Sequence, residues 1–284
     1  MPQPHSHRPS DRLFIVGLSV IGAVYLLLIL AMIAADAAYT TPAVIAKALG
    51  SPAIRYAIKL SLISCTITAI LSVWVAVPLG YLLSRVKFPG RGLVDAALDI
   101  PIVLPPLVVG LSLLILFQVR IGGKSIERHF QETLHLKVTY AVPSVVLAQF
   151  AVACAFAVRT MRVTFDQINP RGEQVALTLG CTRRSAFWLV TLPEARRGIL
   201  TAGTLAWARS LGEFGPILIF SGATPLKTEV LPTSVFLELS TGNIEAAVAV
   251  SLLMVAAAVV VLLLVRMLGG RATMDASLGR GIER

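Results

Sequence analysis

Near its start the chain reads Leu13-Phe-Ile-Val-Gly-Leu-Ser-Val-Ile-Gly-Ala-Val-Tyr-Leu-Leu-Leu-Ile-Leu-Ala-Met-Ile-Ala-Ala35, a stretch of 23 residues without a charged side chain. About 20 apolar residues are enough to cross the hydrocarbon core of a bilayer as a helix. The apolar part is longer than the roughly 7–15 residues of a signal peptide. We therefore expect a membrane anchor that is kept, although Ala35-Asp36-Ala37 resembles a cleavage site.

Five further apolar stretches follow the first, and each is long enough to span a membrane. They are Ile58–Leu83, Ile100–Val119, Tyr140–Val158, Gly198–Ser221 and Ile244–Met267. Of the 284 residues 56% are hydrophobic and 14% charged, whereas a soluble domain carries roughly a quarter charged residues. The mean hydropathy is +0.81. The sequence thus predicts an all-α, polytopic membrane protein with six transmembrane helices and argues against a disordered chain or a typical soluble enzyme.

The positive charges predict an orientation for these helices. The net charge is +10, which we assign to loops on the cytoplasmic face rather than to nucleic-acid binding. With both termini in the cytoplasm, 16 Lys and Arg residues fall inside and 8 outside. We expect cytoplasmic tails at residues 1–12 and 269–284, a transmembrane domain at 13–268, and a long cytoplasmic loop at 159–197 within it.

That loop is predicted to contain two short amphipathic helices joined by a glycine elbow. Pro170 and Glu173 favour a helix start, and Gly180 permits a sharp stop. A second helix should run from about Arg183 to Val190 and end near Pro193. The residues alone leave two readings equally open: an interfacial helix on lipid headgroups, or a knob that docks into another protein.

The loop resembles the EAA loop of bacterial and archaeal ABC-importer permeases. The matching residues are Glu173, Ala176, Gly180, Phe187, Leu192 and Pro193. The resemblance implies that the loop is the coupling helix, which sits in a cleft of the ATPase subunit. Gln174 stands where the motif usually has its acid, and Val175 where it usually has its first alanine. Glu173 is therefore a neighbouring acid, and its own role is open.

Two further stretches are similar to the core of the same family, a type I ABC-importer permease. They are Pro78–Arg91 and Asp99–Gly110. Prolines inside a span need neighbours that satisfy the freed carbonyl groups. Pro105 and Pro106 are expected to kink a helix toward protein or a cavity, with an ordinary proline kink as the alternative.

A charged pair lies within the fifth apolar stretch, which reads Ala208-Arg209-Ser-Leu-Gly212-Glu213-Phe. Charges at membrane depth are energetically costly and usually functional. Arg209 and Glu213 are four residues apart and can meet on one helix face. The alternatives are an ion pair that holds the bundle together and a direct contact with a passing anion.

This segment, with Gly212 inside it, resembles the oxyanion branch of the family, which serves molybdate, tungstate, sulfate and thiosulfate. The pattern Arg-Ser-Leu-Gly-Glu-Phe-Gly is closest to the molybdate/tungstate permeases, and sulfate or thiosulfate is the alternative. The resemblance implies a homodimer of this chain in a bacterial or archaeal plasma membrane. Two copies of an ATP-binding ABC subunit and an extracytoplasmic solute-binding protein would complete the transporter.

The alternative function from a different class is an ATP-independent channel or secondary transporter. In such a protein the loop motif would have no role.

Gly122-Gly123-Lys124-Ser125 resembles the end of a P-loop, but Gln118 stands where that motif needs its first glycine. Three widely spaced cysteines and four scattered histidines indicate neither a disulfide framework nor a metal site. We expect no catalytic residue, cofactor or metal, so the chain itself should not be an enzyme.

Overall fold

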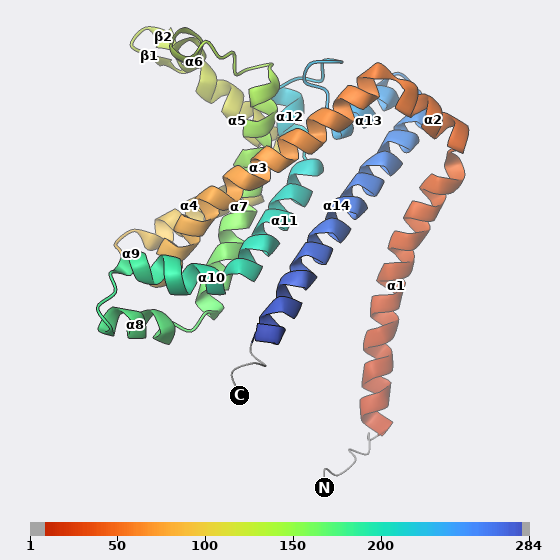
Figure 1. The fold of residues 1–284 in the computed structure, drawn as a ribbon. Helices are drawn as coiled ribbons and strands as arrows, with labels where there is room; N and C mark the ends of the chain where they lie inside the picture. The colour runs from red at the N-terminus through yellow and green to blue at the C-terminus, as the bar shows by residue number, and fades with distance from the viewer. Residues whose placement is uncertain (1–8, 280–284) are drawn as a thin grey trace.

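The computed structural model describes residues 9–279 and confirms an all-α membrane protein. Three helices form its centre: α3 (Pro52–Arg85), α7 (Val142–Gln167) and α11 (Arg196–Leu211), which pack side by side (Figure 1). Their contact faces carry small side chains, which allow close approach of helices in a membrane. Gly80 of α3 is an example, because a Cβ there would lie 2.7 Å from Met161 Cβ of α7.

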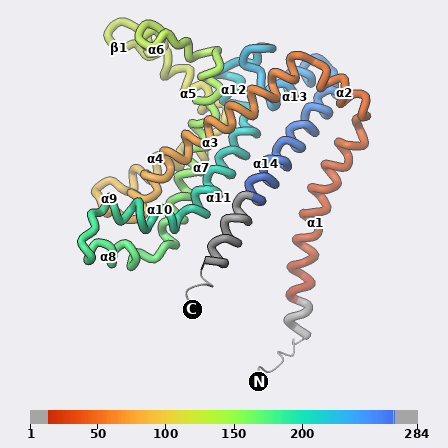
Figure 2. The backbone as a smooth tube through the Cα atoms, viewed as in Figure 1, coloured from red at the N-terminus to blue at the C-terminus, as the bar shows by residue number. Residues whose placement is uncertain are grey.

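Two long helices flank this centre. They are α1 (Pro9–Tyr39), followed by the short α2 (Pro42–Gly50), and α14 (Ile244–Gly279). The tube in Figure 2 shows α1 standing away from the other helices, and its apolar window has no residue buried. The helices α1 and α14 extend into the two predicted tails, 1–12 and 269–284. The outer residues of these tails, 1–8 and 280–284, lie outside the described range.

Two of the six predicted spans are broken rather than continuous. The third consists of α4 (Arg91–Val103) and α5 (Pro106–Gln118), which meet at an angle of 113°. The fifth is divided between α11 and the short α12 (Gly215–Phe220). Within the described residues, four helices are long and apolar enough to span a membrane, or up to five if the bent pair counts as one span. The break at Pro105 coincides with the kink expected at Pro105 and Pro106, whereas the break at residues 212–214 was not predicted.

The two ends of the molecule differ in structure (Figure 1). At the upper end in that view lie a small hairpin, the helix after it and a short helix before α14. These elements are β1 (Arg120–Ile121), β2 (Lys124–Ser125), α6 (Ile126–Leu134) and α13 (Leu231–Ser240). Gly122 and Gly123, part of the P-loop-like sequence, form the hairpin turn, with φ of 61° and 83°.

At the opposite end, the chain leaves α7 and returns to α11 through a bent segment, residues 168–195, which we call the α8–α10 loop. The start of α1 and the end of α14 lie at this same end (Figure 1). The loop contains four short helical pieces in succession: α8 (Arg171–Thr178), α9 (Arg183–Ala186), the π-helical turn η1 (Phe187–Thr191) and α10 (Leu192–Glu194).

Candidate functional site

The glycine elbow of the α8–α10 loop is a Schellman motif. Gly180 has a φ of +91°, which glycine adopts without strain. Its N–H donates to Leu177 O at 3.1 Å, and the N–H of Cys181 donates to Ala176 O at 3.0 Å. These two bonds satisfy the last carbonyl groups of α8. The predicted elbow is therefore present, and Ala176, which is buried, anchors it.

The second arm of the loop ends near Pro193, as predicted, at Glu194. Thr182 caps it, since its hydroxyl accepts from the Ser185 N–H at 3.2 Å. The helix does not end before Pro193. It widens into η1, where the Leu192 N–H donates to Phe187 O, and then continues through α10. Pro193 sits in the first turn of α10, a position where a proline needs no N–H partner.

Glu173 faces into the protein and binds two other elements. Its Oε1 accepts from the Tyr81 hydroxyl of α3, and its Oε2 accepts from the Thr191 hydroxyl of η1 at 3.2 Å. The Tyr81 ring also packs edge-on against Phe187, with ring centroids 4.8 Å apart. One oxygen of Glu173 thus fastens the loop to α3, and the other joins α8 to η1 within the loop. Sequence reasoning did not find Tyr81 or Thr191, because they lie far from Glu173 along the chain.

The loop also exposes large apolar side chains. Leu179 is 79% exposed and Leu189 is 72% exposed. Val175 and Trp188 are also more than half exposed. We call these four residues the apolar face of the loop. Exposed apolar groups clustered on a protruding element indicate contact with a protein or a membrane.

Ion pairs fasten α4 to α7 near the same end. Arg159 Nη2 lies 3.1 Å from Asp99 Oδ2, and Arg162 pairs with Asp95. Arg162 Nε is also 3.9 Å from Asp166 Oδ2 on its own helix. These pairs went unpredicted, although the spacing of Asp95 and Asp99 places both acids on one helix face.

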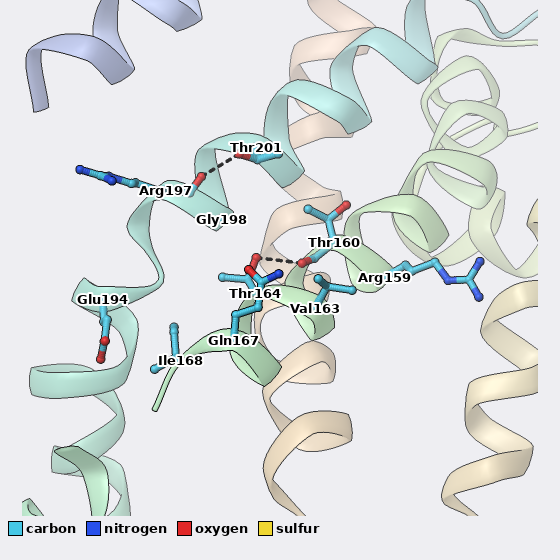
Figure 3. Close-up of a pocket in the computed structure, with 10 residues that line it drawn as sticks. All are labelled: Arg159, Thr160, Val163, Thr164, Gln167, Ile168, Glu194, Arg197, Gly198 and Thr201. Carbon is cyan, nitrogen blue, oxygen red and sulfur yellow. Dashed lines mark hydrogen bonds between the residues drawn. The ribbon is translucent and has the colours of Figure 1, made fainter. Parts of the chain in front are cut away.

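A hollow of about 660 Å³ lies beside the loop, between α7 and the start of α11 (Figure 3). Its hydroxyl groups are occupied within their own helices, because Thr164 donates to Thr160 O at 2.8 Å and Thr201 to Arg197 O at 2.9 Å. Figure 3 shows Arg159 and Arg197 pointing away from one another. Gly198 lies so close to Thr164 that a Cβ would overlap it.

The two helix breaks pack against each other through glycines and prolines. A Cβ on Gly110 of α5 would lie 2.7 Å from Pro216 Cα of α12, and one on Gly215 would lie 2.9 Å from Pro106 Cβ. A glycine from each of the two breaks therefore lies against a proline from the other break. Pro105 is the N-cap residue of α5, and Pro106 begins that helix. The kink is present and Pro106 lies beside Gly215 of α12, but the side chains of Pro105 and Pro106 are both exposed.

Arg209 of α11 meets Glu213, which lies within the second of these breaks. Arg209 Nη1 lies 2.5 Å from Glu213 Oε2. The side chain of Glu213 is only 1% exposed, and that of Arg209 is 30% exposed. The guanidinium carbon is also 5.7 Å from the centre of the Phe156 ring. Gly212 ends α11 beside the pair. The predicted pair thus forms, and the Arg209 side chain stays partly exposed.

The described residues contain no group of three His, Cys, Asp or Glu side chains arranged to hold a metal ion. Cys65, Cys154 and Cys181 are free thiols.

The fold and the sequence both have known relatives. The chain resembles the permease-containing crystal structure of a bacterial ABC transporter that imports alginate, with a TM-score of 0.70 at 19% identity over 91% of this chain and 95% of that one. A second alginate transporter structure, in complex with an alginate-bound periplasmic protein, matches with a TM-score of 0.71 at 17% identity over 93% and 96% of the chains.

Several proteins related in sequence have a higher identity to this chain than these two structures have. The sulfate transport system permease protein CysT of Salmonella typhimurium is 33% identical over 71% of both chains. A probable molybdenum ABC transporter permease of Haloferax volcanii is 34% identical over 81% of both chains. The molybdate/tungstate permease WtpB of Thermococcus kodakarensis is 32% identical over 79% of this chain and 83% of its own.

Residues 76–273 match the family model described as the inner membrane component of binding-protein-dependent transport systems. This range contains the α8–α10 loop, both helix breaks and the Arg209–Glu213 pair. Permease subunits of this kind are membrane components of ABC transporters and are not themselves enzymes. The chain belongs to the family of inner membrane components of binding-protein-dependent transport systems.

Proposed function

We propose that this chain is the transmembrane subunit of an ATP-driven importer for a tetrahedral oxyanion, with molybdate or tungstate as the cargo. The proposal draws on relatives at 30–34% identity that carry molybdate, molybdenum or tungstate in their names. A sulfate permease at 33% identity keeps sulfate as the second candidate. Two copies of the chain would form the pathway, and an external binding protein would deliver the anion.

The proposed coupling role rests on the structure of the α8–α10 loop. The loop is fastened to α3 through Glu173, and it also presents the apolar face. A rigid element with an exposed apolar surface can transmit a rigid-body movement from a partner. In this proposal the partner is the ATP-binding subunit, the loop and both termini lie in the cytoplasm, and ATP binding turns the pathway outward.

Arg209 is the proposed contact for the anion within the membrane. Glu213 would neutralise part of its charge and fix its position, while the Arg209 side chain is partly exposed and would offer its other donors to the anion. A partly neutralised arginine would attract an oxyanion weakly enough to release it. This arrangement suits passage, because tight binding in mid-membrane would trap the cargo.

Transport in proteoliposomes that contain the chain, its ATP-binding subunit and its binding protein tests the proposal. Uptake of labelled molybdate should depend on ATP, and unlabelled tungstate should compete more strongly than sulfate. Gly180→Pro should abolish uptake, because proline cannot adopt a φ of +91°. Stronger competition by sulfate would assign the chain to the second candidate, and uptake without ATP would contradict the coupling role.

A further inference from the structure

Three arginines surround a cleft between the end of α3 and the α8–α10 loop. The cleft has a volume of about 440 Å³, and Arg85, Arg183 and Arg184 line it. Arg85 is the last residue of α3, whereas the other two lie on α9. Two segments almost 100 residues apart in the sequence thus bring their arginines to the same cleft.

The arginines have few partners within the described part of the chain. Arg85 Nη2 donates to Ile168 O at 2.7 Å, but its buried Nε has no hydrogen-bond partner there. Arg183 and Arg184 make no ion pair with a described acidic residue, and both are exposed. A buried N–H without a partner is unfavourable, so the site can accept a further oxygen ligand.

The acid that lines the cleft does not neutralise these charges. Both oxygens of Glu173 already accept hydrogen bonds, from Tyr81 and Thr191. One carboxylate faces three guanidinium groups, which leaves a net positive charge. Arginine is well suited to bind phosphate because its planar guanidinium offers paired donors.

We propose that this cleft binds a phosphate group, and that the group is the headgroup of an acidic phospholipid. Arg85 ends one of the long apolar helices, and long basic side chains near the ends of such helices reach to the membrane interface. Val86, Pro170 and Leu177 add apolar lining beside the arginines. A phosphate with an organic substituent fits this mixed lining better than a bare ion.

Such a lipid would join α9 to the end of α3 on the side where Glu173 already joins α8 to it. The α8–α10 loop would then be held by one internal carboxylate and one external phosphate. A membrane rich in acidic lipid would thereby stiffen the loop. This role does not depend on which anion the protein transports.

The test uses the full-length chain purified in detergent and native mass spectrometry. The probes are phosphatidylglycerol, phosphatidylcholine and inorganic phosphate. The wild-type chain should retain phosphatidylglycerol in preference to phosphatidylcholine. The double variant Arg183→Gln with Arg184→Gln should bind phosphatidylglycerol about thirtyfold more weakly, given roughly 1 kcal/mol for each basic residue near a membrane surface.

A matched control is available at the start of α11. Arg196 and Arg197 are also adjacent and exposed, and neither lines the cleft. Arg196→Gln with Arg197→Gln removes the same charge and should leave phosphatidylglycerol binding within about twofold of wild type. Arg85→Lys, which keeps the charge but loses the Nε donor, should weaken binding independently of the α9 variant.

The outcomes separate the two sources of phosphate. If inorganic phosphate binds with the same dependence on Arg183 and Arg184 while phosphatidylglycerol does not, the phosphate site is supported and the lipid assignment is overturned. If both double variants lose phosphatidylglycerol equally, the binding reflects general charge and the proposal fails. Equal binding by wild type and the α9 variant also overturns it.

Discussion

The Tyr81 hydroxyl of α3 donates a hydrogen bond to the Glu173 carboxylate of the α8–α10 loop. Glu173 also accepts from Thr191, so one acid connects the membrane bundle with both arms of the loop. In the proposed transporter, this contact would carry movement between the loop and α3.

Tyr81→Phe removes one partner of Glu173 and keeps the ring that packs on Phe187. We expect the loop to be destabilised by about 1–2 kcal/mol, because a half-buried carboxylate loses a donor. Hydrogen exchange over residues 171–191 measures this change. Tyr56→Phe is the control, since that hydroxyl donates to Lys227 O at 3.1 Å in another part of the molecule. Equal exchange in this segment for both variants would show that the Tyr81 contact does not hold the loop.

Gly110→Ala and Gly215→Ala should each destabilise the protein by about 1–3 kcal/mol, because the added methyl group would overlap the facing proline. Thermal unfolding in detergent measures the effect. Gly22→Ala of α1 is the control, because no atom lies within 4 Å of a Cβ at that position. If all three variants unfold at the same temperature, the two helix breaks are not packed as described.

Arg209→Ala leaves Glu213 buried without its partner, which should cost about 3–5 kcal/mol. The double variant Arg209→Met with Glu213→Met removes both charges and should recover much of that loss. The exchanged pair, Arg209→Glu with Glu213→Arg, should partly restore stability. Thermal unfolding of the three proteins distinguishes these cases. An exchanged pair no more stable than Arg209→Ala would argue against a simple ion pair.

Glu132 of α6 provides a test of pH dependence outside the membrane. A hydrogen bond from Lys124, followed by one from Arg128, lowers the pKa of Glu132 below its usual value. The stabilisation is therefore present above the unfolded pKa and is lost as the pH falls through the lower folded pKa. The protection of α6 amides against hydrogen exchange, relative to their intrinsic rates, should fall over that acidic range. Glu132→Gln should remove this pH-dependent contribution. An unchanged pH profile in Glu132→Gln would contradict it.

Much of the architecture follows from patterns that are local in the sequence. The apolar stretches predict membrane helices, and Gly180 with Pro170 predicts the elbow of the loop. Arg209 and Glu213 are one helical turn apart, so their pairing could also be expected. Each of these features depends on residues close together along the chain.

The features that escaped prediction depend on residues distant in sequence. Spacing does not reveal that Tyr81 meets Glu173 or that Gly110 lies against Pro216, because these contacts arise only when the helices pack. The break in the fifth span was missed for a related reason. Residues 212–214 lie inside a longer apolar stretch that looks like one span despite Glu213, and the packing of Gly215 against Pro106 arises only in the folded structure.

The most direct test of the account is whether the apolar face of the loop binds the ATP-binding subunit. Leu179→Ser should weaken association of the two purified subunits about thirtyfold or more, since anchor residues at interfaces contribute about 2 kcal/mol or more. Leu93→Ser of α4, which is also 79% exposed, should leave association unchanged. Undiminished association and ATP-driven uptake in Leu179→Ser would contradict the proposal that this face couples the chain to its ATPase.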